Sequence, residues 1–326
     1  MERKNITRAL KYTLSVILAA VFVWLAFRKV DWAAFLGGLQ QTRWGFVVLF
    51  FAAALTALLF RTLRWKAILG ALDKSIRPVT VWDANNVGNL ANVVLPGSGE
   101  LVRCGYVTSP KARYDKVLGT VILERVWDIL AIACLLAGAL IGGRDRLEGF
   151  FRENFWEPLR GAPGLSLWWI AALSVALVAL CIWAVYHFRS GNRICGKIAG
   201  AVSGILKGFA SFGRMEHKWL FALYTALIWL MYVCMGWSIL KAMPDLSGLG
   251  FTDALLISAV GNIASVIPVP GGIGAYHYLV ALTLSSLYGA GWDCGILYAT
   301  LNHELHTVLI IALGVLSYFA LQMRKK

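Results

Sequence analysis

Charged residues are scarce in this sequence. Asp, Glu, Lys and Arg make up 15% of its 326 residues, against about 25% in soluble domains. Acidic residues are the scarcest, with 17 Asp and Glu against 31 Lys and Arg, a formal net charge of +14. Apolar residues reach 59%, and no soluble fold of this length has enough interior to bury them. The composition excludes a soluble protein and predicts an integral membrane protein.

Motifs for metal binding, catalysis and nucleic-acid binding are also missing. The six cysteines form no CxxC pair and the histidines no compact HxxxH pair, so we expect no metal site and no cofactor. No Ser–His–Asp arrangement stands out, so we do not expect an enzyme. The basic excess lacks a soluble, aromatic-interleaved stretch that would bind nucleic acid. It is instead typical of cytoplasmic loops beside an anionic leaflet.

Six apolar runs have about the length of roughly 20 residues that a spanning helix needs. They are Tyr12–Phe27, Trp44–Phe60, Val117–Ile141, Leu167–Tyr186, Trp219–Leu240 and Leu297–Leu321. The first follows a basic N-terminal segment, as a signal peptide would. Because no convincing small-residue cleavage site follows it, we expect an uncleaved helix.

The distribution of basic residues predicts the topology. They concentrate at both ends of the chain, in 61–77 after the second run, and in 187–218, whereas 142–164 balances its arginines with acids. The positive-inside rule therefore predicts cytoplasmic termini and a cytoplasmic 187–218 segment, with 142–164 outside. Apolar residues at helical spacing in 187–218 also predict an interfacial helix. We expect a multi-pass protein of the bacterial cytoplasmic (inner) membrane.

Two further apolar stretches, 79–112 and 251–288, are interrupted by proline and glycine. The interrupting residues are Pro96, Gly97 and Gly99 in the first stretch, and Pro268, Pro270, Gly271, Gly272 and Gly274 in the second. Backbone groups freed at such breaks must be satisfied by protein or water, because lipid cannot hydrogen-bond to them. Each stretch therefore predicts a re-entrant helix–break–helix hairpin that returns to its own side of the membrane.

The two broken stretches resemble each other. The segments GNLANVV at 88–94 and GNIASVI at 261–267 both precede a Pro-Gly break, and the shift of 173 residues from 88 to 261 carries Trp44 close to Trp219. The chain thus divides into repeats of approximately 1–150 and 165–326, which the predicted topology inverts. Inverted repeats with interrupted helices are typical of secondary transporters. We expect an all-α polytopic membrane protein with about six transmembrane helices and two re-entrant hairpins.

Polar side chains in these apolar stretches are the candidate site residues. A charge facing lipid at a helix centre costs about 2.5–3.5 kcal/mol, so these side chains should face inward. The candidates are Arg64, Asn89, Asn92, Glu100, Arg103, Glu124, Arg125, Asp128, Asn262, His277 and His303, with Asn302, Glu304 and His306 near the last. Packing ion pairs, buried hydrogen-bonded histidines, and asparagines that satisfy freed carbonyls remain alternatives to a substrate-binding role.

Three motifs lie in order along the chain. They run from Asn89 through Glu100 to Arg103, from Glu124-Arg125 to Asp128, and from Pro268 to Gly274, with Arg64-Trp65 upstream. Together they resemble the lysylphosphatidylglycerol synthase transmembrane (flippase-like) family, along essentially the whole chain. The resemblance implies lipid handling, since members include the lipid-translocating N-terminal domain of the multiple peptide resistance factors.

Two features depart from this family pattern. His277 stands where a glutamate commonly follows the second break, which puts an acid-dependent role there in doubt. The sequence stops at Lys326 without an aminoacyltransferase domain, so we do not expect it to synthesise lysylphosphatidylglycerol.

The expected function is translocation of an anionic or phosphate-linked lipid, with Arg64, Arg103 and Arg125 as phosphate contacts. The alternatives are a secondary transporter of small anions or amphipathic solutes, and a non-transporting partner of a lipid or glycan biosynthetic enzyme. A homo-oligomer is also open.

Overall fold

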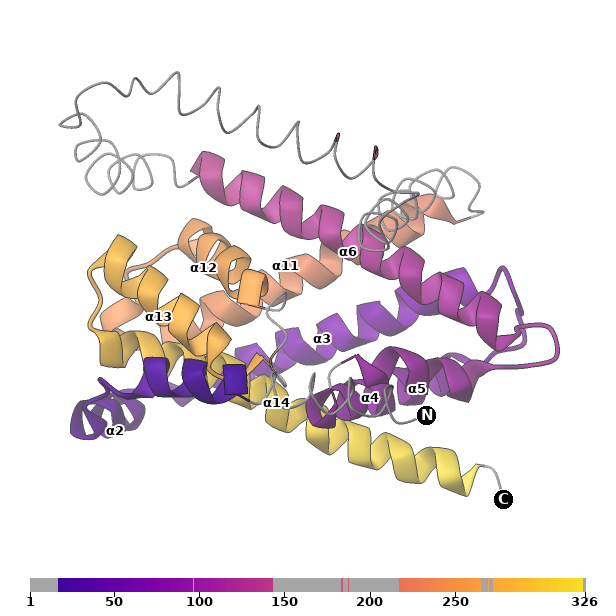
Figure 1. Ribbon diagram of the computed structural model, residues 1–326, viewed down its shortest axis with the longest axis horizontal. Coiled ribbons are helices and arrows are strands. Elements are labelled where there is room, and N and C mark those ends of the chain that lie inside the picture. Colours follow the sequence, from indigo (N-terminus) through magenta and orange to yellow (C-terminus); the bar gives the residue numbers. More distant parts are fainter. Residues whose placement is uncertain are drawn as a thin grey trace. The chain divides into compact units, whose positions relative to one another are not determined.

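The computed structural model describes residues 17–95, 97–142, 183, 187, 217–264, 269 and 272–324. Over these ranges the chain is helical and contains no β-strand (Figure 1). A first helix spans Ile17–Phe27. The others are α2 (Trp32–Gln41), α3 (Trp44–Leu69), α4 (Pro78–Val94), α5 (Ser98–Val107), α6 (Tyr114–Gly142), α11 (Lys218–Ala242), η2 (Pro244–Leu246), α12 (Phe251–Ile263), α13 (Ala275–Tyr288) and α14 (Trp292–Met323).

The chain divides into two compact units, residues 1–143 with 219–326, and residues 144–218. Almost all of the second unit lies outside the described residues, including the predicted span Leu167–Tyr186 and the predicted interfacial helix in 187–218. The site described below belongs to the first unit.

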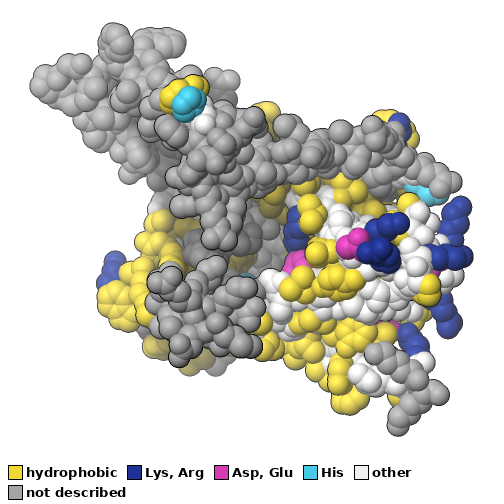
Figure 2. Space-filling view, turned by 45° about the vertical axis from the view of Figure 1, so that its right-hand side comes forward, with side chains coloured by type: hydrophobic (Ala, Val, Ile, Leu, Met, Phe, Trp, Pro, Cys, Tyr) yellow, Lys and Arg dark blue, Asp and Glu magenta, His cyan; other side chains and the backbone are white. Residues whose placement is uncertain are grey.

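Three of the described helices, α3, α11 and α14, are long and apolar enough to cross a membrane. Large apolar side chains on them are exposed, among them Val48 on α3 and Leu316 on α14, and hydrophobic side chains cover much of the described surface in Figure 2. Helix α6 has 29 residues but carries the charged residues of the predicted site in its first half. The prediction of an all-α polytopic membrane protein is confirmed.

The second predicted run, Trp44–Phe60, is shorter than the helix that contains it. Helix α3 continues without interruption through the basic residues after Phe60 to Leu69. The reason is that Arg64 is 2% exposed and its charge is neutralised inside the protein, so it does not have to leave the helix to reach water. Helix α2, for which no run was predicted, begins with Asp31 accepting hydrogen bonds from Ala33 N and Ala34 N.

Each broken stretch forms two helices that pack against each other, α4 with α5 and α12 with α13. The corresponding glycines of the repeat, Gly88 and Gly261, make the close approach possible. A Cβ atom on Gly88 would lie 2.9 Å from the Gly99 carbonyl oxygen, and one on Gly261 would lie 2.6 Å from Cε2 of Tyr276. Gly97, at the first break, has a φ of 78°, a left-handed conformation that favours glycine. The predicted helix breaks are therefore present.

The two long helices α6 and α14 each contact both broken pairs. Helix α14 packs on α13 near Gly295 and on α4 near Gly314, and Figure 1 shows it running past both. Helix α6 pairs with α5 through Glu124 and Arg103 and approaches α12 at Gly142. In the sequence repeat, α4 corresponds to α12, α5 to α13 and α6 to α14. The contacts of α6 with α5 and α12 therefore correspond to those of α14 with α13 and α4.

Helices α3 and α11, which correspond in the sequence repeat, run antiparallel. The backbone N–H of Arg43, before α3, donates to the carbonyl of Ala242 at the end of α11 at 2.8 Å. Towards the other end of α3, Phe60 stacks on Tyr224 with ring centroids 6.0 Å apart. An inverted repeat requires this relative direction.

Candidate functional site

One face of α6 docks on the C-terminal part of α3 through polar contacts. Thr120, Glu124 and Asp128 share this face because they are spaced four residues apart. Trp65 Nε1 donates to Thr120 Oγ1 at 2.9 Å. Arg64 lies 3.3 Å from Glu124 through Nε and 2.7 Å from Asp128 through Nη1. The charges face inward, as the cost of exposing them to lipid requires.

Arg103 brings α5 into the same network. Its Nη2 donates to Glu124 Oε2 at 2.7 Å and its Nη1 donates to Asn85 Oδ1 at 2.9 Å. The guanidinium lies 4.4 Å above the Trp65 ring. Arg103 and Glu124 are both buried, so Glu124 joins two arginines from different helices and neither arginine remains an uncompensated buried charge.

Arg125 points away from that buried core. Its side chain is 48% exposed and forms an ion pair with Glu100 on α5, while Nη1 lies 3.8 Å from Asp128. Among the arginines of this cluster, Arg125 is the one that an incoming anion could reach without unpacking the core.

Two of the three predicted asparagines, Asn92 and Asn262, bind backbone groups. Asn92 Oδ1 accepts a hydrogen bond from Gly99 N at 2.7 Å, in the first turn of α5, where helical N–H groups lack partners. Asn262 Nδ2 donates to the Ser258 carbonyl at 2.8 Å. Asn89 Nδ2 is buried, and no described residue accepts from it.

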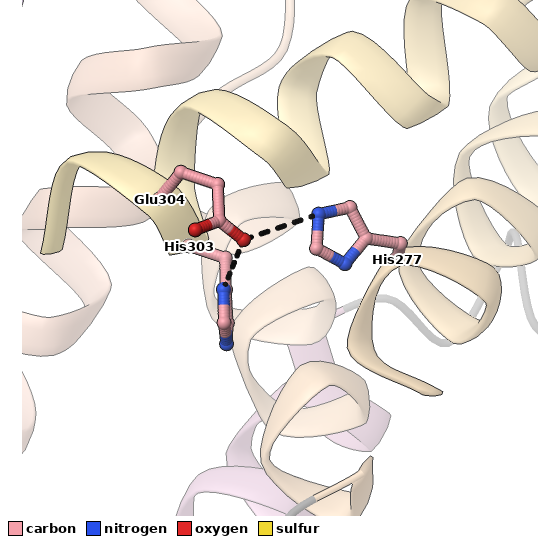
Figure 3. Close-up of side chains that lie close together, drawn as sticks. All are labelled: His277, His303 and Glu304. Atoms are coloured by element: carbon pink, nitrogen blue, oxygen red, sulfur yellow. Dashed lines mark hydrogen bonds and ion pairs between the residues drawn. The ribbon is translucent and has the colours of Figure 1, made fainter. Parts of the chain in front are cut away.

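A second polar cluster lies where α13 meets α14 (Figure 3). His303 Nδ1 is 2.8 Å from Glu304 Oε1, and His277 Nε2 is 3.8 Å from the same oxygen. His277 is buried at 2% exposure, whereas the Glu304 side chain is 42% exposed. The next helical turn carries His306, whose Nε2 is buried without a hydrogen-bond partner in the described part of the chain.

A cavity of about 540 Å³ connects the two clusters and both helix breaks. The predicted site residues that line it are Arg64, Asn92, Glu100, Arg125, Asp128, Asn262 and His303, together with Gly97 and Gly272 from the breaks. Asn89, Arg103, Glu124, His277, Gly99 and Gly274 are not among its lining residues. Pro96, Pro268, Pro270 and Gly271 lie outside the described residues.

Several residues of this cavity were missed from the sequence. Arg61, Tyr232 and Tyr276 line it, and Asn85 orients Arg103. Arg61 could have been found, because it lies one helical turn before Arg64. The tyrosines carried no such signal, since aromatic residues are common at the ends of membrane helices.

Arginines outnumber carboxylates on the cavity wall, with three of the former and two of the latter among the described lining residues. The formal charges of these five side chains sum to +1. The cavity is therefore suited to an anionic group.

The sequence of residues 12–314 matches the family model described as the lysylphosphatidylglycerol synthase TM region. The chain belongs to this family. Comparison with curated proteins and with solved structures finds no match. The chain is therefore a membrane protein of a lipid-related family. The predicted resemblance is confirmed.

Proposed function

We propose that this member of the lysylphosphatidylglycerol synthase transmembrane family translocates a lipid with an anionic or phosphate-linked head group across the bacterial cytoplasmic membrane. One observation carries the proposal. A single cavity is lined by residues of both helix breaks and by arginines of α3 and α6. Interrupted helices that meet at a substrate site are the usual arrangement in secondary transporters.

The head group would bind beside Arg125. The volume of about 540 Å³ falls in the range of small-molecule sites, and a planar guanidinium matches phosphate oxygens. Glu100 and Asp128 are the partners of Arg125 in the structure. A phosphate would replace these carboxylates as the partner of Arg125, while Arg64 and Arg103 stay bound to Glu124.

A second, apolar cavity favours a lipid over a small anion. It measures about 390 Å³ and is lined by residues of α6, α11 and α12, with Trp127, Leu230 and Leu255 among them. Trp229 lines both cavities. A molecule with its head group beside Arg125 could therefore place an acyl chain between α6 and α11, past Trp229.

The inverted repeats would provide the conformational change that exposes the cavity to each side of the membrane. If the two hairpins are re-entrant from opposite faces, opening one and then the other exposes the same cavity to each side in turn. The antiparallel direction of α3 and α11 and the exchangeable contacts of α6 and α14 support this arrangement. Both termini would then lie in the cytoplasm.

The test is transport by purified protein in proteoliposomes. Head-group exposure of a fluorescent anionic phospholipid would be followed by a quencher that cannot cross the membrane. Arg125→Ala should slow translocation by more than about 10-fold, because a charge-assisted contact of about 1.5–3 kcal/mol is lost. Arg113→Ala is the matched control, since Arg113 is 73% exposed and paired only with Asp115 among the described residues.

Three results would count against the proposal. Full activity of Arg125→Ala would remove this residue from the mechanism. Uptake of free phosphate without lipid movement would favour the small-anion transporter. Neither activity in the wild type, together with co-purification of a lipid or glycan biosynthetic enzyme, would favour the non-transporting partner.

A further inference from the structure

We propose that His277, His303 and Glu304 bind a divalent transition-metal ion, with Zn²⁺ as the representative of the class. This proposal concerns a site on α13 and α14, and it does not depend on lipid transport. It also reverses the expectation, drawn from the absence of cysteine pairs and of an HxxxH motif, that the chain holds no metal.

The three side chains already converge on one point. Their ligand atoms, one from each residue, all lie within 4.8 Å of one another. Figure 3 shows one carboxylate oxygen of Glu304 facing a ring nitrogen of each histidine, and the two separations are 2.8 Å and 3.8 Å. Zn²⁺ holds nitrogen and oxygen ligands at about 2.0–2.2 Å, so tetrahedral ligands lie about 3.4 Å apart. The observed separations fall on either side of that value.

The donor set selects the class of ion. Two imidazoles and one carboxylate suit Zn²⁺ and its neighbours in the first transition series, whereas Mg²⁺ and Ca²⁺ prefer oxygen ligands only. Three protein ligands with a remaining open position are also typical of zinc sites that interact with a further molecule. We therefore expect Zn²⁺ or Co²⁺ to bind and Mg²⁺ to fail.

The surroundings hold the ligands in place. His277 lies in the first turn of α13, buried against the ring of Phe27 at a centroid distance of 5.5 Å. His303 packs on Tyr276 with centroids 5.3 Å apart. Helices α13 and α14 cannot separate easily, because Gly295 allows their backbones to approach closely at Ala281. Ligands on packed helices are better positioned than ligands on loops.

The location of the site suggests a use for the ion. All described arginines that line the cavity of about 540 Å³ come from α3 and α6, and the lining residues of α11 to α14 include no arginine. His303 lines this cavity, so a bound ion would place positive charge on the wall that lacks it. This consequence, unlike metal binding itself, rests on the proposed transport of an anionic head group.

The experiment measures metal binding by the full-length protein in detergent, purified through an affinity tag that contains no histidine. After treatment with a chelator, the protein would be dialysed against Zn²⁺ or Co²⁺, and bound metal would be counted per chain. The triple variant H277Q/H303Q/E304Q sets the baseline for the other histidines and the cysteines. We expect one additional ion in the wild type.

Each single substitution, H277Q, H303Q or E304Q, should weaken binding by more than about 10-fold, since loss of even an outer-shell partner has an effect of this size. H306Q is the matched control, because His306 is a neighbouring, partly buried histidine on α14 that is outside the cluster. Zn²⁺ should raise the thermal unfolding midpoint of the wild type and of H306Q, but not of the ligand variants.

A second measurement keeps the test valid if a variant fails to fold. Co²⁺ bound to the wild-type protein should give an absorption spectrum typical of nitrogen and oxygen ligands, without the intense charge-transfer band of a thiolate. A wild type that binds no more metal than the triple variant would overturn the proposal. So would a thiolate spectrum, or an H306Q variant that loses as much affinity as H277Q.

Discussion

Arg64 binds Asp128 through both of its terminal nitrogens, with Nη1 2.7 Å from Oδ1 and Nη2 3.3 Å from Oδ2. The same guanidinium donates through Nε to Glu124. One side chain of α3 thus holds two carboxylates of α6, in a fork geometry that only arginine provides. The side chain of Arg64 is 2% exposed and that of Asp128 is 17% exposed, so the contact is screened less than a surface ion pair.

Removing this arginine should destabilise the protein strongly. Arg64→Ala leaves two carboxylates short of a partner in the interior, and breaking a buried pair in this way costs about 3–5 kcal/mol. The measurement is thermal or denaturant unfolding in detergent. Arg113→Ala, in an exposed pair with Asp115, should change stability by less than about 1 kcal/mol. Equal stability losses for the two variants would contradict a structural role specific to Arg64.

The crossing of α4 and α5 should be sensitive to a single methyl group. A Cβ atom on Gly99 would lie 2.1 Å from the Gly88 carbonyl oxygen, whereas Gly105 on the same helix has nothing within 4 Å of that position. Gly99→Ala must force the helices apart, and overpacking of this kind costs typically about 1–3 kcal/mol. Gly105→Ala should be neutral or stabilising by up to about 1 kcal/mol, because alanine favours helix. Unfolding midpoints that do not separate the two variants would show that the helices cross differently.

A hydrogen-bonded contact between loops outside the membrane spans should make the stability of the protein depend on pH in a defined way. Hydrogen bonds from Ser109, in the α5–α6 loop, and from Ser75 lower the pKa of Asp73 to about 2. Because the folded-state pKa lies below the unfolded value of about 3.9, the stabilisation is complete above that value and is lost as the pH falls towards 2. The difference in unfolding midpoint between wild type and Asp73→Asn should therefore be constant near neutral pH and shrink below about pH 4.

Ser109→Ala is the companion variant for that measurement. It removes the largest cause of the low pKa of Asp73, so the loss of stability on acidification should begin at a higher pH than in the wild type. A wild-type advantage over Asp73→Asn that persists unchanged below pH 2 would contradict the ionised contact.

The sequence was enough to predict the elements whose physical causes are local. Apolar runs predicted α3, α11 and α14, and the Pro-Gly breaks predicted that α4 and α5 are separate helices. The spacing of Thr120, Glu124 and Asp128, four residues apart, is by itself enough to put them on one face of α6. In each case the signal lies within one or two helical turns, where periodicity and backbone conformation decide the outcome.

What the sequence could not provide is the pairing between distant helices. Arg125 and Arg103 were equivalent phosphate candidates by residue type, but the fold buries Arg103 on Glu124 and leaves Arg125 half exposed. His277 and Glu304 are 27 positions apart, so their proximity depends on how α13 packs on α14. The extension of α3 beyond the apolar run was not predicted for the same reason, since the partners of Arg64 come from α6.

The predicted topology can be tested with cysteine pairs that flank each hairpin. In a background without native cysteines, Lys74→Cys and Lys111→Cys would lie before α4 and after α5, at exposed loop positions. Gly248→Cys and Gly291→Cys would flank α12 and α13, at positions with open space for a side chain. Re-entrant hairpins in inverted repeats predict that a membrane-impermeant thiol reagent reaches both members of the first pair from the cytoplasm and both members of the second pair from outside.

The pattern of labelling separates this topology from its alternatives, because each pair reports whether its hairpin returns to the side from which it entered. A hairpin that crosses the membrane would place the two members of its pair on opposite sides. Two hairpins that return to the same side would label all four cysteines together, and the repeats would then be parallel. Either pattern would remove alternating access through the cavity, since that mechanism needs one hairpin on each face. Only labelling of each pair from its own side is consistent with a head group that reaches Arg125 from both sides of the membrane in turn.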